Sequence, residues 1–477
     1  EARGRGFVQD VGRAGEARVR VEVAPARTGR RSIRSFHLYS LRAFALLSVG
    51  LPLWAQYAGP AILSRGEAPT AMRGAPITFR PFLDIMGVYD TGLTGVSVRN
   101  NEGDLAQDSS LGVEASAGVS GSHAWRRTTV GLDYRGSVRH YTRKTYYDGT
   151  DHAFGLGLTH QMSRRVMFSL RESAGMFSRD FGLIGGLRST VPFDPVSSYL
   201  PSTDFFDNRT LYMSSQADFT YQKSARLSFN GGGDIFAARR RSQALYGVTG
   251  ASARGDMQYR VARYTTIGAT YSFAHYDFSK GFGGSDIHTI AATYAHRLTR
   301  RLEFSGYGGA FRSETKFIQA VQIDPVIAAI IGVSSGIRVV HRIDTAPAGG
   351  ARLSYSFRRA VASVGYSRGT TPGNGLFLTS QTSTVDGQLT YNGFKRWSAG
   401  LSGGYRSNKV ISNVDGNYSG YSGSATLARR LIPAVHFRAS FYVQQYDSGS
   451  FSRYNRLIYR GTVGFSFSPG DLPVRIW

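Results

Sequence analysis

The chain contains no cysteine, and it has no hydrophobic run long enough to cross a bilayer as a helix. Without cysteine, neither a disulfide framework nor a thiolate metal site can form. The apolar stretch from Ala43 to Trp54 falls short of the roughly 20 residues that a spanning helix needs. After residue 79, no segment keeps the apolar period of a capped amphipathic helix. These absences point away from disulfide-rich scaffolds and from helical folds.

What the sequence has instead is strict alternation of apolar and polar residues. Between Val435 and Gln444, apolar side chains occupy every second position, and shorter runs of the same kind lie at 130–135 and 154–159. A period of two places one set of residues on each face of a β-strand. One face is apolar and the other is small, hydroxylated or charged. The sequence therefore predicts an all-β chain.

Short basic turns punctuate these runs. The first basic residues of the eight turns are Arg126, Arg164, Arg226, Arg263, Arg300, Arg358, Lys395 and Arg429. Successive turns are 34 to 38 residues apart, except for two longer gaps of 62 and 58 residues. Most turns have an aromatic residue or histidine shortly upstream and an alternating run downstream. The repeat is a strand, a tight basic turn, a second strand and a more variable loop, which identifies a repeat architecture.

Each repeat holds two long runs, which distinguishes between architectures. A propeller blade fits four short strands into roughly 40 residues, whereas a transmembrane strand takes about 9–11 residues. We therefore predict a closed antiparallel transmembrane β-barrel with short basic periplasmic turns and longer outer loops. The predicted count is about 18 strands, with 16 as the alternative, from about Arg80–Asp90 to about Arg456–Phe467. Barrels of roughly 16–18 strands leave a water-filled interior.

The N-terminal region has the features of a secretory signal. Basic residues from Arg30 to Arg42 precede the apolar stretch Ala43–Trp54, and Ala55 follows it as the small residue before the predicted cleavage site. The first methionine is Met72. We assign residues 1–29 to a mis-called upstream extension, 30–55 to a signal peptide, 56–79 to a periplasmic lead-in and 80–477 to the barrel. The predicted location is the outer membrane of a Gram-negative-type envelope.

The net charge of +25 would suggest nucleic-acid binding in a soluble domain. The turns, however, hold 17 of the basic residues, and without these and the first 55 residues the chain has 30 basic and 28 acidic residues. The excess is a ring at one rim, which we interpret as an anchor of the periplasmic edge rather than a nucleic-acid surface. The alternative is a vestibule that concentrates anions.

With these features, the chain resembles the general and substrate-specific porins of bacterial outer membranes. The segments His160–Phe168 and His296–Phe304 resemble their periplasmic turns. The resemblance implies that the barrel-assembly machinery reads an aromatic C-terminal strand, here ending in Phe465 and Phe467 or in Trp477. It also implies that the third outer loop, about 178–209, folds inward, which would place Asp180 and Asp194 at a constriction. The alternative is an ordinary surface loop.

The second long gap, about 312–345, contains the apolar segment Pro325–Gly332. Such a run is not expected to remain bare in water. It could plug the lumen, cap the barrel or contact a neighbouring subunit, and we predict a plug or cap.

Strand parity gives a set of charged residues on the predicted polar faces, where charged rings set pore selectivity. These candidates are Asp133, Arg135, Arg139, Arg171, Asp218, Asp234, Arg254, Asp256, Arg352, Arg438, Arg456 and Arg460. The same residues could instead brace the wall. We predict passive diffusion of small polar solutes with a weak anion preference. We expect no cofactor and no metal. The barrel is expected to lie in outer-membrane lipid, and a homo-oligomer is left open.

Two other classes compete with a pore. An omptin-like protease or a phospholipase-like barrel would need an acid–histidine site, for which Asp148, Asp151 and His152, or Asp286 and His288, are the candidates. Because no acid–base arrangement can be placed from sequence alone, we predict no catalytic residues. A non-conducting structural or export-associated barrel is the third class, which a lumen filled by Pro325–Gly332 would favour.

Overall fold

The computed structural model describes the chain from residue 77 to residue 474 with internal gaps. The described ranges are 77–92, 98–99, 105–106, 109–142, 148–177, 210–240, 246–279, 283–372, 379–391, 393–394, 396–411, 417–448, 456–469 and 472–474. The first 76 residues, with the predicted extension, signal peptide and most of the lead-in, lie outside them, as do Asp180, Asp194 and Trp477.

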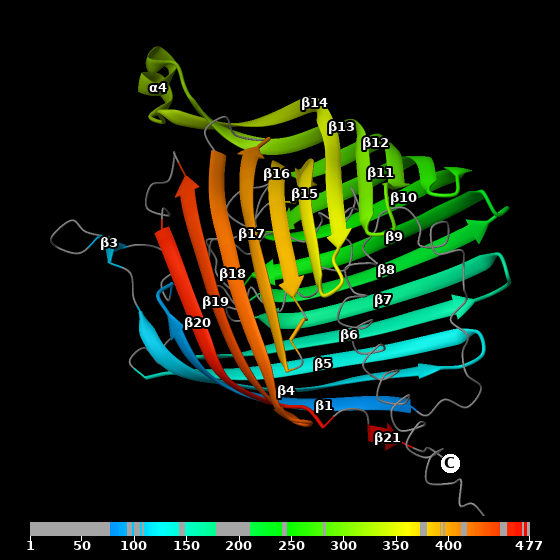
Figure 1. The fold of residues 1–477 in the computed structure, drawn as a ribbon. Coiled ribbons are helices and arrows are strands. Elements are labelled where there is room, and N and C mark those ends of the chain that lie inside the picture. Colours follow the sequence, from blue (N-terminus) through cyan, green and yellow to red (C-terminus); the bar gives the residue numbers. More distant parts are fainter. Residues whose placement is uncertain are drawn as a thin grey trace, which may run out of the picture. The chain divides into compact units, whose positions relative to one another are not determined.

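Eighteen long strands form the wall (Figure 1). They are β1 (Ile77–Asp90), β4 (Ser110–Ala124), β5 (Thr128–Tyr141), β6 (Gly149–Gln161), β7 (Val166–Phe177), β8 (Thr210–Gln222), β9 (Leu227–Arg240), β10 (Gly247–Ala262), β11 (Thr265–Ser279), β12 (Gly284–Arg297), β13 (Leu302–Gln322), β14 (Ser335–Ser356), β15 (Ala360–Thr371), β16 (Ser380–Tyr391), β17 (Trp397–Val410), β18 (Asn417–Ile432), β19 (Val435–Ser448) and β20 (Arg456–Phe467). The short elements are β2 (Val98–Arg99), β3 (Leu105–Ala106), β21 (Leu472–Val474) and the helix α4 (Pro325–Ile331).

The wall closes on itself. From β4 to β20, each strand pairs antiparallel with the next, and β1 pairs with both β4 and β20. At the seam, Leu83 of β1 lies opposite Ala117 of β4 and Phe467 of β20. Below β20, β21 continues the pairing along the start of β1. The closed antiparallel barrel of 18 strands confirms the predicted fold class, and its last wall strand has the predicted bounds. No helix within the described ranges is long and apolar enough to span a membrane.

The two faces of the wall differ as the alternation predicts. Large apolar side chains such as Leu111, Met213 and Ile290 point outward and are 61–64% exposed. Their neighbours in the chain point inward and are mostly hydroxylated, small or charged. An outward apolar face with a polar interior is the arrangement of an outer-membrane barrel, because lipid surrounds the wall and water fills the lumen. Lipid burial of these outward side chains is therefore the main stabilising contribution expected of the wall.

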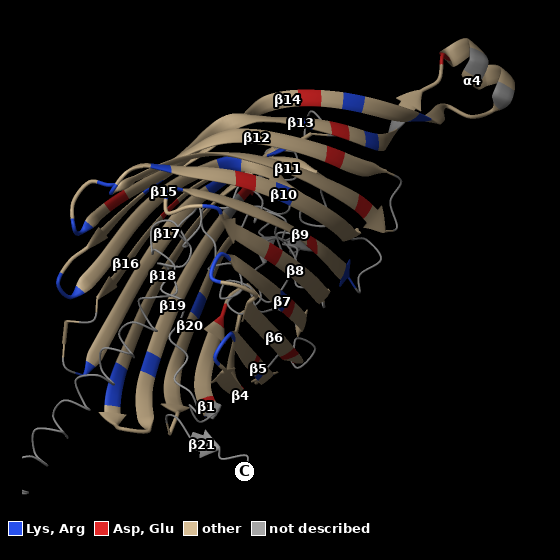
Figure 2. Cartoon of the chain, turned by 90° about the vertical axis from the view of Figure 1, so that its right-hand side faces the viewer, with Lys and Arg blue, Asp and Glu red and all other residues tan. Residues whose placement is uncertain are grey.

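The basic turns gather at one rim (Figure 2). The predicted positions at Arg126, Arg164, Arg226 and Arg300 fall between paired strands, as expected. The eighth prediction is wrong in detail, because β18 continues through Arg429 to Ile432 and the turn is Pro433–Ala434. A register shift between Arg430 and Ile432 allows the strand to run past the basic pair.

The second long gap is not a loop. β13 and β14 pair with each other along their whole lengths, from Leu302 opposite Tyr355 to Gln322 opposite Ser335. β12 pairs with β13 only as far as Thr315, and β15 pairs with β14 only as far as Gly349. The two strands therefore continue past the rim as a free two-stranded ribbon, which we call the β13–β14 ribbon (residues 316–341).

The helix α4 forms the tip of this ribbon, away from the wall (Figures 1 and 2). The Asp324 carboxylate accepts a hydrogen bond from the Val326 amide (2.9 Å), and Gly332 ends the helix in the left-handed region, where glycine has no steric penalty. Val326 and Ile330 are 70% and 79% exposed. The prediction that this segment plugs or caps the barrel is wrong, because self-pairing of the hairpin carries it outward.

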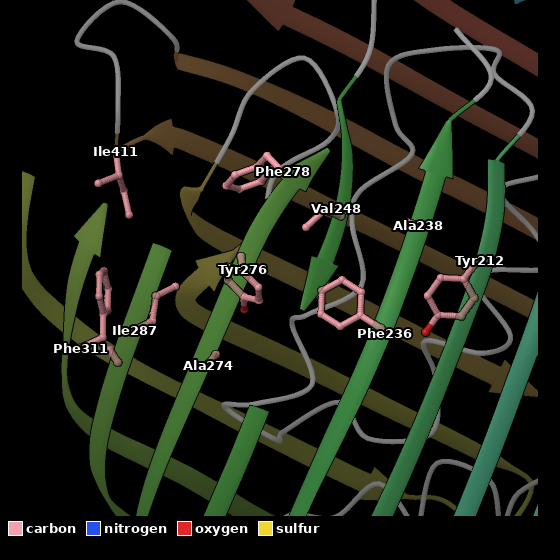
Figure 3. Packing of buried hydrophobic residues seen from close by; sticks show 11 residues of the cluster. Tyr212, Phe236, Ala238, Val248, Ala274, Tyr276, Phe278, Ile287, Phe311 and Ile411 are labelled. Atoms are coloured by element: carbon pink, nitrogen blue, oxygen red, sulfur yellow. The ribbon is translucent and has the colours of Figure 1, made fainter. Parts of the chain in front are cut away.

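An apolar cluster covers the inner face of the outer half of the wall, over β8–β14 (Figure 3). Tyr276 and Phe311 lie at its centre and are almost fully buried. Ile411, which follows β17, packs into the same cluster. Nearby, the hydroxyl of Thr379, which precedes β16, bonds to that of Ser285 on β12 (2.5 Å). Segments from the β16–β17 side thus reach the inner face of β12, so they narrow the outer mouth at this side.

Candidate pore lining

The strand register places all twelve predicted lining positions on the inward side of the wall. Asp133 and Arg135, for example, alternate with the outward Leu132 and Tyr134. Paired residues on neighbouring strands lie on the same face of the wall. On β7–β10, β14, β19 and β20, this pairing also places the candidates on the face opposite to the exposed apolar side chains. For Arg456, only the backbone position is described. Ten of the twelve positions fall into three charged groups, and Arg352 stands apart from them.

The first group is a buried ion cluster beneath the outer mouth. Arg139 on β5 donates from Nε to Glu114 Oε2 (3.0 Å) and from Nη2 to Asp151 Oδ2 (3.1 Å). Arg460 on β20 donates to the same Glu114 oxygen (2.7 Å). The Arg139 side chain is 1% exposed. Two arginines and two acids therefore balance across β4, β5, β6 and β20, and Arg139 braces the wall instead of contacting a solute.

The second group is centred on one carboxylate, that of Asp84. Asp84 Oδ2 on β1 is 3.4 Å from Arg438 Nη1 on β19 and 3.9 Å from Arg135 Nη2 on β5. The Ser116 hydroxyl also donates to this carboxylate (3.4 Å). Asp84 is buried, whereas the side chains of Arg438 and Arg135 are 49% and 36% exposed. Asp133, two positions before Arg135 on the same inward face of β5, also interacts electrostatically with Arg135, so two carboxylates and two guanidinium groups meet in this group.

The third group is richer in acid. On β8, Asp218 accepts from Arg254 Nη2 (2.6 Å) and from Gln216 Nε2 (3.0 Å). Arg171, Asp234 and Asp256 are close enough to Asp218 to influence it electrostatically. Three carboxylates and two guanidinium groups leave this part of the inner wall slightly negative.

Arg352 stands apart on β14. Its Nη2 donates to the Ser363 hydroxyl on β15 (3.1 Å), and Asp386 on β16 contributes a favourable electrostatic interaction. Its side chain is mostly buried, so it links three neighbouring strands.

The candidate catalytic residues are not paired as they were grouped from sequence, and Asp148 bonds instead to His140 Nδ1 (2.6 Å). Asp151 points inward to Arg139, while the next residue, His152, points outward and bonds to the Tyr134 hydroxyl (3.0 Å). On β12, Asp286 bonds to His275 Nδ1 (2.6 Å), and His288 bonds instead to the Tyr271 hydroxyl (2.8 Å). Among the described residues, no three acidic or histidine side chains are arranged to hold a metal ion.

Several ionisable residues were missed in the sequence analysis: the shared acids Asp84 and Glu114, and Glu172 on the other face of the wall. Glu172 on β7 lies opposite Leu156 of β6 and Ser215 of β8, on the outward, lipid-facing side. The Ser215 hydroxyl donates to its carboxylate (2.6 Å). The signal was present in the chain, because placing Arg171 inward places Glu172 outward.

No protein-family model and no curated protein matches this chain. Solved structures similar to it include OpdQ of Pseudomonas aeruginosa (9% identity, 84% of this chain and 98% of that one, TM-score 0.41). OccAB3 of Acinetobacter baumannii is also similar (10% identity, 82% and 99%, TM-score 0.40), as is the copper transporter OprC (10% identity, 82% and 67%, TM-score 0.44). The fold class rests on the strand register described above, and these likenesses add no functional detail.

Proposed function

We propose that this chain is a porin-like channel through which small polar solutes diffuse passively across the outer membrane, with a weak preference for anions. A closed wall of 18 strands is in the size range in which side chains do not fill the interior, so water and solutes have room to pass. Passive diffusion needs no catalytic residue and no cofactor.

The observation that carries the proposal is the sharing of Asp84 by Arg135 and Arg438. Both guanidinium groups are partly exposed on the inward side, whereas the carboxylate that they share is buried. Guanidinium groups exposed to an aqueous path attract anions and raise their local concentration. The buried cluster of Glu114, Asp151, Arg139 and Arg460 holds two acids and two arginines and contributes little to this preference.

The measurement that tests the preference is the reversal potential in a potassium chloride gradient. The wild-type channel is expected to favour chloride slightly, and Arg438→Gln should shift the ratio of chloride to potassium permeability toward potassium. Arg226→Gln, in an exposed basic turn, is the matched control and should leave the ratio unchanged. An equal shift in both variants would assign the preference to the basic rim instead, and a shift in neither would refute it.

A further inference from the structure

A recess of about 280 Å³ lies on the inner faces of β16–β19, away from the charged groups described above. Its floor consists of small residues on two neighbouring strands: Ser402 and Gly404 of β17 lie opposite Ser424 and Ser422 of β18. The hydroxyls of Ser402 and Ser424 bond to each other (2.7 Å). Because no large side chain fills these inward positions, the wall is hollowed here.

Polar side chains surround this floor on three sides. On β16, Asp386 lies opposite Gly404, and Gln388 lies opposite Ser402. On β19, Gln444 lies opposite Ser422. Arg406 lines the recess at the next inward position of β17. With Asn408 of β17, the lining combines one carboxylate, one guanidinium and three amides.

Tyrosine completes the lining. Tyr442 of β19 borders the recess, and its hydroxyl donates to the Gln444 side-chain oxygen (2.6 Å). This bond holds the amide at the edge of the floor and fixes the orientation of the ring. An aromatic ring beside fixed polar groups offers an apolar surface together with hydrogen-bond partners.

We propose that this recess binds a neutral polyhydroxylated solute of mono- or disaccharide size. The proposal rests on the channel function proposed above and names the class of solute that the channel takes up. The lining holds one carboxylate, Asp386, and one guanidinium, Arg406, so its formal charge is zero and it favours neither a net anion nor a net cation. A hydroxyl both donates and accepts, so it can satisfy carboxylate, guanidinium and amide groups at the same time. The volume is close to the lower end, roughly 300 Å³, of pockets that hold small ligands.

The first experiment measures binding directly, without conduction. Sucrose is added to the folded, detergent-solubilised barrel, and saturation-transfer NMR reports contact between sugar and protein. We expect saturable transfer that Ser402→Val, which fills the floor, reduces at least fivefold. Asp386→Asn should weaken the apparent affinity at least threefold, because it replaces a charged hydrogen-bond acceptor by a neutral amide.

The chain offers a matched control on another part of the wall. Ser173 of β7 and Ser214 of β8 also form an inward serine pair at 2.7 Å, so Ser173→Val makes the same change outside the recess. This variant should bind sucrose as the wild type does. Equal losses in Ser173→Val and Ser402→Val, or no sucrose transfer in the wild type, would overturn the proposal. Stronger transfer to the zwitterion glycine betaine than to sucrose would also overturn it.

The second experiment uses planar bilayers and separates this proposal from the proposed channel function. Sucrose should reduce the ion current of the wild type in a saturable way, and more weakly in Ser402→Val. A channel that conducts but binds no sucrose in either assay keeps the channel function and removes the recess as a binding site. A folded barrel that binds sucrose but never conducts keeps the site and removes the channel function.

Discussion

The buried ion cluster around Arg139 gives the sharpest test of how the wall is held together. Replacing Arg139 by glutamine removes both hydrogen-bonded ion pairs, to Glu114 at 3.0 Å and to Asp151 at 3.1 Å. The Arg139 and Asp151 side chains are each 1% exposed, so water cannot replace the lost guanidinium without opening the wall. Breaking a buried ion pair by removing one partner costs about 3–5 kcal/mol.

Glu114 keeps its contact with Arg460 (2.7 Å), so we place the loss at the lower end, about 3 kcal/mol. Reversible urea unfolding of the barrel in phospholipid vesicles measures it. Arg438→Gln is the control, because its partly exposed pair with Asp84 at 3.4 Å should contribute at most about 1 kcal/mol. The triple variant Arg139→Gln, Glu114→Gln and Asp151→Asn should recover part of the loss. A change below about 1 kcal/mol in Arg139→Gln would refute the bracing role.

Two further predictions concern the outer surface of the barrel and the free ribbon. Glu172→Leu should raise the free energy of unfolding by about 1 kcal/mol, because a carboxylate on the lipid face is unfavourable even with its Ser215 partner. A clear loss of stability in the same urea assay would indicate that Glu172 faces protein instead of lipid. Replacing residues 319–338 by an Asn-Gly turn should close the hairpin at the pair Ile318–Val339 and leave both strand content and conductance unchanged. Circular dichroism measures the strand content, and bilayer recordings measure the conductance. A rise in conductance would mean that the ribbon obstructs the pore.

Much of the fold could be predicted because the strands and turns of the barrel have local sequence patterns. The alternation from Val435 to Gln444 gives one strand and both of its faces, and the basic turns give the strand count. The same reasoning misplaced the turn after Arg429, because a register shift lets β18 continue through a pair of basic residues. Basic pairs mark the rim, but they do not end a strand.

The ribbon could not be predicted from the repeat. Residues 316–322 do not alternate strictly, and nothing local says that they pair with 335–341 instead of folding over the lumen. The hydrogen bonds of the hairpin satisfy its backbone groups outside the wall, so the apolar segment is carried outward as α4.

For the charged candidates, the sequence predicts the face of the wall but not the burial of each side chain. Parity places Arg139 and Arg438 on the inward side, but it does not reveal that one is buried between two acids and the other is half exposed. That difference depends on partners such as Asp84, which is 354 residues from Arg438 in the chain. Closure of the barrel creates this contact. Residues that brace the wall can therefore be distinguished from those that reach the lumen only in the closed structure.

The central claim is that the wall encloses a path for ions and small solutes, and single-channel recording tests it most directly. Purified chain is folded into lipid, its barrel is verified by its strand content, and it is added at low concentration to a planar bilayer in potassium chloride. The account predicts discrete, reproducible current steps that Arg438→Gln retains with a shift toward potassium. A verified, fully folded barrel that inserts and never carries current would contradict it.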